Sequence, residues 1–372
     1  MWVVRDAMTS PDDIDRFIDF ATRTRFHILF VQVRGRGDAY YHSSLVPPAD
    51  QLKYPIGDFD PLAYVLVRAH AAGISVHAWL NVYYVWSNGR STPSDGHVVK
   101  LHPEWLITDA EGIRMDERDV EAWQADGIEG YFLSPFSAEA RAHSVEVVRE
   151  LVDRYAVDGI HLDYIRFPGA EYGYGTEPRT RFALQWGVDP IDLRNNSLEL
   201  SAVLGADAVG ALDDVWVDRR AQGVDSMVIA IRNVIGDLPL SAAVMPDLQI
   251  AQSEKGQSWA RWVHQRWVDF VVPMAYNYRP EELLEWVRVL QNTVGREQML
   301  VGLALHDGRD QYLDRSINIL RVDRVAGFSL FSYNVLAEKR FAGQFIDQIF
   351  QPVAESEDPY EDSQDPSEEE EP

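Results

Sequence analysis

Eight short runs of apolar and β-branched residues are spaced along this chain, and each precedes a stretch with the periodicity of an amphipathic helix. Strands that alternate with helices predict parallel pairing, because parallel strands must be joined by long crossover connections. Eight such units predict a closed (β/α)8 barrel in a single domain, 1–350. The predicted strands are Trp2–Arg5, Ile28–Arg34, Ser75–Asn81, Gly159–Ile165, Leu240–Met245, Phe270–Ala275, Met299–Leu305 and Gly327–Ser332.

The helix signals support this alternation. Ser10 is placed to cap the first helix, Pro11 suits its first turn, and Asp12 and Asp13 lie where the helix dipole favours negative charge. We therefore expect a helix to start at this point of the chain. The predicted helices lie near 12–22, 60–72, 138–155, 223–235, 257–267, 281–292, 309–321 and 337–349.

Charge is concentrated at the C-terminus. The net charge is −25, and the last twenty residues carry ten acidic side chains and no basic one. The segment 353–372 has too little apolar surface to offset the entropy of ordering, so it is predicted to be a disordered tail. The remaining charge of −15 argues against duplex nucleic acid as a partner.

Several classes of chemistry lack their residues here. The chain has no cysteine, which excludes disulfides, thiolate catalysis and Cys-ligated zinc. The sequence contains neither HExxH, GxSxG nor a Walker loop, so we expect no metal and no cofactor. We expect no membrane span, since no apolar run approaches about 18 residues. Met1 runs directly into a strand-like segment without a secretion signal, which predicts a cytoplasmic protein unless a signal was removed.

Two connections, 82–137 and 166–222, are far longer than usual βα loops, and such loops are commonly functional. Both follow predicted strands, so in a barrel they would wall a cleft at the active-site face. Their aromatic residues suit stacking against sugar faces, or alternatively the filling of a small core within each loop. These residues are Tyr83, Tyr84, Trp86, Trp105 and Trp123 in the first connection and Tyr172, Tyr174 and Trp186 in the second.

Polar and ionisable side chains follow almost every predicted strand. In a (β/α)8 barrel these positions meet at one mouth, where catalytic groups collect. Carboxylates, aromatic rings and amides without thiols or a phosphate loop match glycoside hydrolysis best. The residues are Arg5, Asp6, Arg34, Arg36, Asp38, Asn81, Asp163, Arg166, Asp247, Tyr276, Asn277, His306, Asp307, Tyr333 and Asn334.

The segment GIHLDYIRFP at 159–168 supplies the main candidate. It reads as a buried strand that ends in Asp163, and alternation places His161 on the opposite face from Leu162. We predict that Asp163 is a catalytic carboxylate, with Arg34 or Arg166 lowering its pKa and keeping it ionised. The alternative is an Asp–Arg ion pair that merely caps the strand.

Glycoside hydrolysis usually needs a second carboxyl group. Asp247 is the first choice, as an acid whose pKa would be raised by apolar neighbours such as Met245. Asp307 and Asp38 compete with it, and each of the three has a loop-cap or turn role as its alternative. If the sugar carries an N-acetyl group, its carbonyl could replace the enzyme nucleophile, and one acid would suffice.

Four segments together resemble the glycosyl hydrolase-like 10 family of bacterial TIM-barrel proteins. They are VQVRGRGDAYY at 31–41, GISVHAWLN at 73–81, VDGIHLDYIRFP at 157–168 and WVDFVVPMAYNY at 267–278. The resemblance implies glycosidase-like activity and, for some members, a link to peptidoglycan glycan strands. It places six residues at the family's motif positions at the barrel mouth: Arg34, Asp38, Asn81, Asp163, Arg166 and Tyr276.

We therefore predict an enzyme that cleaves O-glycosidic bonds of an oligo- or polysaccharide. One rival is a carbohydrate-binding barrel without catalysis. Another is a barrel enzyme for a phosphorylated metabolite, which needs a phosphate pocket that GLALHDG and SYNV do not resemble. The residues predicted to bind substrate are Arg34, Asp38, Asn81, Trp86, Arg166, Tyr276, Asn277, His306 and Tyr333.

Overall fold

A computed structural model describes residues 1–55, 57–87, 93–118, 127–306 and 309–338 of the protein. The predicted tail 353–372, Trp123 and the competing carboxyl Asp307 lie outside these described residues. Most of the last predicted helix, 337–349, also lies outside them.

The core of the fold is a barrel of parallel strands, as the sequence predicted. Six strands form one sheet in the order β1-β2-β3-β6-β7-β8, and β9 pairs with β10. Bridges from Val271 to Met299 and from Met274 to Gly302 join the two sheets, and Trp2 packs on Phe331 at 5.9 Å between ring centroids where β10 returns to β1. The barrel strands are β1 (Trp2–Val3), β2 (Ile28–Arg34), β3 (Ser75–Asn81), β6 (Gly159–Asp163), β7 (Leu240–Val244), β8 (Phe270–Pro273), β9 (Leu300–Ala304) and β10 (Gly327–Phe331).

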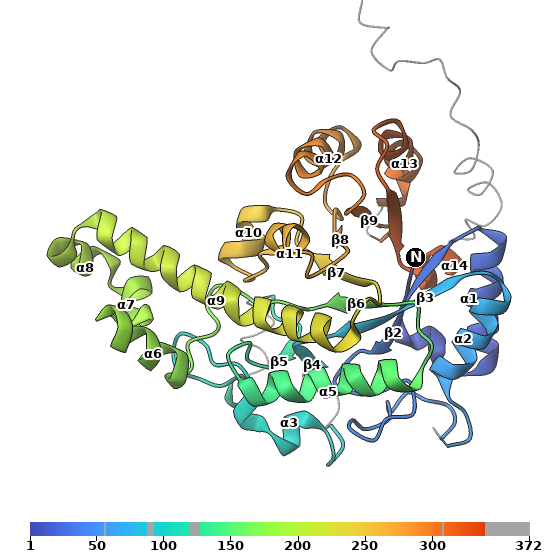
Figure 1. Ribbon diagram of the computed structural model, residues 1–372, viewed down its shortest axis with the longest axis horizontal. Helices are drawn as coiled ribbons and strands as arrows, with labels where there is room; N and C mark the ends of the chain where they lie inside the picture. The colour runs from blue at the N-terminus through green and yellow to red at the C-terminus, as the bar shows by residue number, and fades with distance from the viewer. Residues whose placement is uncertain (56, 88–92, 119–126, 307–308, 339–372) are drawn as a thin grey trace, which may run out of the picture.

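Helices follow the strands and cover the outside of the barrel (Figure 1). The predicted start of the first helix is confirmed, because the Ser10 hydroxyl accepts the backbone N–H of Asp13 at 3.3 Å. The covering helices are α1 (Pro11–Arg23), α2 (Pro61–Ala71), α5 (Ala138–Arg154), α9 (Ala206–Ile235), α10 (Leu248–Ser253), α11 (Trp259–His264), α12 (Pro280–Val294), α13 (Leu313–Val322) and α14 (Tyr333–Glu338).

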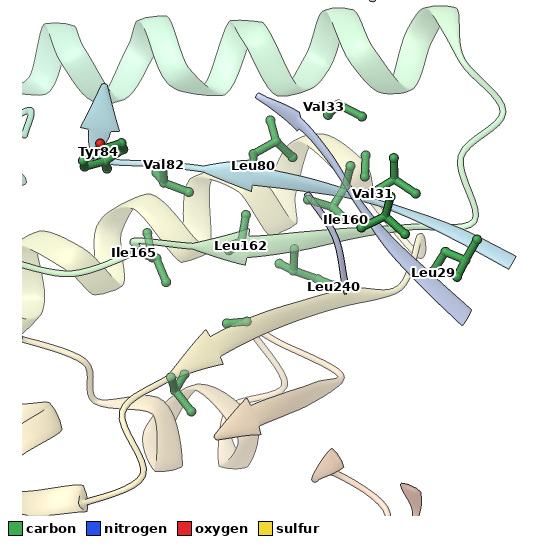
Figure 2. Packing of buried hydrophobic residues seen from close by; sticks show 14 of the residues in the cluster. Leu29, Val31, Val33, Leu80, Val82, Tyr84, Ile160, Leu162, Ile165 and Leu240 are labelled. Atoms are coloured by element: carbon green, nitrogen blue, oxygen red, sulfur yellow. The ribbon is translucent and has the colours of Figure 1, made fainter. Parts of the chain in front are cut away.

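The strands carry two different faces. The outward side chains form the main hydrophobic cluster under the helices, and Figure 2 shows this layer with Val31, Leu80 and Leu162 among its members. The inward side chains of the barrel floor form a separate cluster of Trp2, Phe30, Trp79 and Val272. Alternation along each strand therefore decides which residues face the barrel interior.

The connection 82–137 folds back over the barrel. It contains β4 (Tyr84–Ser87) and β5 (Gly130–Phe132), which pair antiparallel, and the short helices α3 (Val98–Leu101), η2 (Pro103–Trp105) and η3 (Met115–Glu117). We call this antiparallel pair the β4–β5 hairpin, although a long connection separates its strands; it was not predicted from the sequence. Because β4 begins three residues after β3, the pairing brings the end of the long connection back beside the end of β3.

The connection 166–222 forms a helical extension. It contains α6 (Thr176–Trp186), α7 (Pro190–Asn195), α8 (Ser197–Leu204) and the first half of α9, so the predicted helix 223–235 was too short. Figure 1 shows α6, α7 and α8 at the left end, away from the strands. A small core of Tyr174, Phe182, Leu193, Val209 and Trp216 with Ala110 holds this extension.

The aromatic residues of the two connections mostly fill such cores. Tyr83, Trp86, Tyr172 and Tyr174 are all buried. The alternative reading of these rings, as packing within the loops, therefore holds for most of them. Among the described residues, no helix combines the length and the apolar character that crossing a membrane requires.

Candidate active site

Asp163 is the last residue of β6 and faces the barrel interior. Along this strand Ile160 and Leu162 belong to the outer cluster, whereas His161 contacts Trp2 inside the barrel. The predicted opposite orientation of His161 and Leu162 is thus confirmed, and Asp163 shares the inward face with His161. Asp163 lies in register with Asn81, the last residue of β3, so both stand at the C-terminal mouth.

Burial dominates the electrostatics of Asp163, whose residue surface is 8% exposed. The pKa of this carboxyl is raised to about 6, chiefly by loss of solvent and to a smaller extent by the negative charge of Glu129. The backbone N–H of Tyr164, which Oδ1 accepts at 2.7 Å, the charge of Arg166 and the Trp79 indole all lower the pKa without outweighing burial. Arg166 therefore lowers this pKa, as predicted, but burial outweighs the arginine and the pKa is raised overall, contrary to the prediction.

Tyr164 and Arg166 form one wall of the mouth beside Asp163. The Arg166 guanidinium lies over the Tyr164 ring at 4.7 Å, and the buried Nε of Arg166 has no hydrogen-bond partner in the described part of the chain. Tyr164 adopts a φ of 46°, a strained conformation for a tyrosine. Strain of this kind gathers at functional sites, and here it turns the ring toward Tyr84, 4.8 Å away between centroids.

Tyr276 and His306 lie at the same mouth. Burial raises the pKa of the Tyr276 hydroxyl well above its usual value, and the charge of Asp163 raises it further, so the two side chains are close. The Tyr276 ring contacts His306 at 6.1 Å and Phe331 at 5.7 Å between centroids. Asn277 follows on the exposed side. A small pocket adjoins Tyr276 and is lined also by Ala275, Tyr278, Leu303, Ala304, Tyr312, Leu313 and Ser316.

Asn81 lies beside Asp163, but its side chain is occupied by the protein. Its Nδ2 donates to the Gly35 carbonyl at 2.8 Å, and its Oδ1 accepts from Trp79 at 3.1 Å and from Gln32 at 3.4 Å. These bonds fix the rim of β3 rather than leave an amide for sugar hydroxyls. Asn81 therefore has the geometry of a positioning residue.

Arg34 does not point into the barrel. A register shift between Gln32 and Arg34 sets Arg34 opposite Leu80, which faces outward. Its Nη1 donates to the Asn81 carbonyl at 2.5 Å, and its charge, after burial, lowers the pKa of His143 on α5. The predicted contact of Arg34 with Asp163 is therefore not formed, and the guanidinium ties β2 to β3 under α5.

Asp38 and Trp86 belong to a buried network beside the mouth. The Asp38 carboxylate accepts the backbone N–H of Arg36 at 2.9 Å, and the Arg36 guanidinium lies over Trp86 at 4.8 Å. Trp86 is only 3% exposed and packs edge-on against His97. Asp38 thus fits its alternative reading as a turn residue, and Trp86 is not an open stacking platform.

Asp247 and Tyr333 also have structural positions. Asp247 is exposed and caps α10, with Oδ1 accepting the backbone N–H of Ile250 at 2.8 Å. Tyr333 is buried against Phe17 and Phe20 of α1. Capping of α10 explains why an aspartate stands at position 247, so another residue is needed as the second carboxyl.

Glu129 was missed by the sequence analysis, which considered only residues that follow strands. It precedes β5, is exposed, and accepts a hydrogen bond from the Tyr164 hydroxyl. Its charge acts on Asp163 as described above. Only the pairing of β5 with β4 brings it to the mouth, and the sequence carries no pattern for that short hairpin. The described residues contain no group of three or more side chains arranged to hold a metal ion.

Comparison with protein families and curated sequences gives consistent results. The model of the glycosyl hydrolase-like 10 family matches residues 3–306. The glycosyl hydrolase DigH of Escherichia coli K12 is 26% identical over 302 residues, which are 78% of this chain and 64% of that protein. The glycosyl hydrolase YngK of Bacillus subtilis is 26% identical over 158 residues, 41% of this chain and 28% of that protein. This chain thus spans less than two thirds of the length of these relatives.

Solved structures with the same fold include two from glycoside hydrolases. The glycoside hydrolase domain of PgaB (BpsB) from Bordetella bronchiseptica matches with a TM-score of 0.66 and 16% identity, over 95% of this chain and 99% of that one. Alpha-L-fucosidase isoenzyme 2 from Paenibacillus thiaminolyticus matches with a TM-score of 0.55 and 15% identity, over 94% of this chain and 48% of that one. At these identities the likeness establishes the fold alone.

Proposed function

Because the chain belongs to the glycosyl hydrolase-like 10 family, we propose that it is a glycosidase that cleaves an O-glycosidic bond in an oligo- or polysaccharide. Asp163 is its essential carboxyl. The observation that carries the proposal is a buried carboxyl with a pKa of about 6 at the mouth of the barrel, beside Arg166 and Tyr276. A carboxyl poised near the working pH is the group that protonates a departing sugar oxygen.

The surrounding residues support a sugar-sized ligand. Arg166 holds a donor without a protein partner among the described residues, and Tyr276, His306 and the exposed Asn277 offer a ring, an imidazole and an amide at the same rim. Arg166 is the residue we expect to bind a sugar hydroxyl or a ring substituent, and Tyr276 is the one we expect to contact the sugar face. An N-acetylated glycan of the peptidoglycan type is the finer substrate that we propose to test first.

The test is turnover on a panel of oligosaccharides with and without N-acetyl groups, read by mass spectrometry of the products. Asp163→Asn keeps the size and removes the acid, so we expect turnover to fall by at least about 10³-fold. Asp158→Asn is the matched control, because Asp158 precedes the same strand at its opposite end, where its carboxylate accepts the backbone N–H of Val76. That variant should retain turnover.

The pH dependence gives a second check. Asp163 must carry a proton to act as an acid, so kcat/KM should fall as pH rises through about 6, approaching tenfold per unit above it. Glycan binding by the wild type without any cleavage would instead support a non-catalytic carbohydrate-binding barrel and reject the proposal.

A further inference from the structure

Glu129 reaches the barrel mouth through the β4–β5 hairpin, where it directly precedes β5. In that hairpin Gly130 lies opposite Ser87, and Phe132 lies opposite Tyr84. A Cβ at Gly130 would come within 1.9 Å of the Trp86 carbonyl oxygen, so the two backbones approach as closely as glycine allows. Glu129 directly precedes this close contact.

The hairpin packs directly on the residue that follows Asp163. The rings of Tyr84 and Phe132 lie 4.8 and 5.8 Å from the Tyr164 ring between centroids. The Tyr164 hydroxyl then donates to Oε2 of Glu129. Because Tyr164 is adjacent to Asp163 and has its unusual backbone conformation, this bond directs the Glu129 carboxylate to the rim above Asp163.

We infer that Glu129 is the second carboxyl of the active site, a general base that faces the substrate opposite Asp163. The inference rests on the proposed glycosidase function. It replaces Asp247, whose carboxylate caps α10. The environments of the two acids differ, since Asp163 is buried and Glu129 is exposed to solvent.

The electrostatic pattern supports this placement. The negative charge of Glu129 adds to burial in raising the pKa of Asp163, of Tyr164 and of Tyr84. These three side chains come from two different strand ends, so the charge of Glu129 acts on the mouth as a whole. The charge of Glu129 therefore favours the protonated form of Asp163.

In the proposed step Asp163 is the general acid and Glu129 is the general base. Asp163 gives its proton to the glycosidic oxygen as the bond between that oxygen and the anomeric carbon breaks. Glu129 takes a proton from a water molecule whose oxygen forms the new bond to the anomeric carbon. One water is added across the bond, and proton exchange with solvent returns the proton from Glu129 to bulk water and restores the proton on Asp163.

The experiment compares Glu129→Gln with wild type on a glycan that the wild type cleaves. We expect kcat to fall by about 10²- to 10⁴-fold. Azide, which needs no general base, should restore turnover and yield a glycosyl azide of inverted configuration. The limb of the pH profile assigned to Asp163 should also move to lower pH, because the charge that raises its pKa is gone. Glu111→Gln, an exposed glutamate on the same connection, is the matched control and should change nothing.

The outcomes separate the two proposals. If Asp163→Asn abolishes turnover while Glu129→Gln stays within threefold of wild type, the assignment of Glu129 is wrong and the glycosidase function stands. Rescue by azide with retained configuration would also overturn the general-base role. If the wild type cleaves no glycan, the function itself falls, and the inference falls with it. Circular dichroism of each variant establishes that the fold is retained.

Discussion

Two titratable side chains, His161 and Asp163, lie two residues apart on the same face of β6, but their surroundings in the barrel differ. His161 is completely buried in the barrel floor, and both ring nitrogens have partners: Trp2 Nε1 donates to its Nε2 at 3.1 Å, and Nδ1 pairs with the Ser241 hydroxyl at 2.9 Å. Because the indole can only donate, Nε2 is the acceptor and Nδ1 carries the proton. Burial lowers the pKa of His161 well below its usual value, so the ring stays neutral.

Asp163 lies two residues further along the strand than His161, at the barrel mouth instead of the closed floor. Its neighbours include a cation, a second acid and a tyrosine, and burial still raises its pKa to about 6. The floor residue is held in one protonation state, whereas the mouth residue can exchange its proton near neutral pH. Burial alone therefore does not mark a reactive group; the difference lies in whether the surroundings fix a single protonation state.

The largest expected effect on stability comes from breaking the floor. His161→Ala leaves Trp2 Nε1 and Ser241 without their partner and opens a cavity between Trp2 and Phe30, whose ring stacks on the imidazole at 4.1 Å. We expect the free energy of unfolding in urea to drop by about 3–5 kcal/mol. Ser241→Ala, which removes the hydroxyl's hydrogen bonds to His161 and to the Ile160 carbonyl but opens no large cavity, should cost only about 1 kcal/mol. A loss below about 1 kcal/mol in His161→Ala would show that the floor is not a structural site.

The sequence was sufficient for much of this comparison. The alternation of apolar runs predicted the eight barrel strands, with β2 and β3 matching residue for residue. The period of two along GIHLD placed His161 and Leu162 on opposite faces, and the structure shows that His161 is the one inside the barrel. The same pattern identified Asp163 as the residue at the mouth.

The sequence-based predictions failed where contacts between residues far apart in the sequence determine a side chain's position or pKa. The register shift at Gln32 depends on pairing with β3, and it turned Arg34 outward. The pKa of Asp163 depends on how little solvent reaches it, which a list of neighbouring arginines does not reveal. Glu129 lies 34 positions before Asp163 and approaches it only through an unpredicted hairpin. Asp247, by contrast, opens a helix, and its capping role is one that its residue type favours.

A smaller change in the free energy of unfolding, and a stabilising one, is expected for substitution of Asp163 at the barrel mouth. The carboxyl of Asp163 titrates at about 6 in the folded protein against 3.8 for an ordinary aspartate, so the folded state holds the proton more tightly between these values. Raising the pH through this window therefore destabilises the wild type, and Asp163→Asn escapes that loss. We expect the variant to be more stable than wild type at pH 8 by up to about 3 kcal/mol, and nearly equal at pH 4.

Urea denaturation of both proteins at several pH values between 4 and 8 measures this difference. Histidines that stay neutral in the fold, such as His77 and His161, make both proteins less stable in acid, and their contribution cancels in the comparison. An Asp163→Asn variant that is less stable than wild type at pH 8 would mean that the carboxylate is held by the fold as an ion. The contrast between mouth and floor would then disappear.

The smallest effect on stability and turnover is expected at Asp247, whose carboxylate caps the backbone of α10. Asp247→Asn should leave both stability and turnover nearly unchanged, because asparagine caps a helix about as well as aspartate. Asp247→Ala removes the acceptor for the Ile250 N–H and should cost about 1 kcal/mol of unfolding free energy while turnover persists. If Asp247→Asn instead loses turnover by more than tenfold with its stability intact, Asp247 is the second catalytic carboxyl. In that case the carboxyl that follows β7, and not Glu129, completes the site.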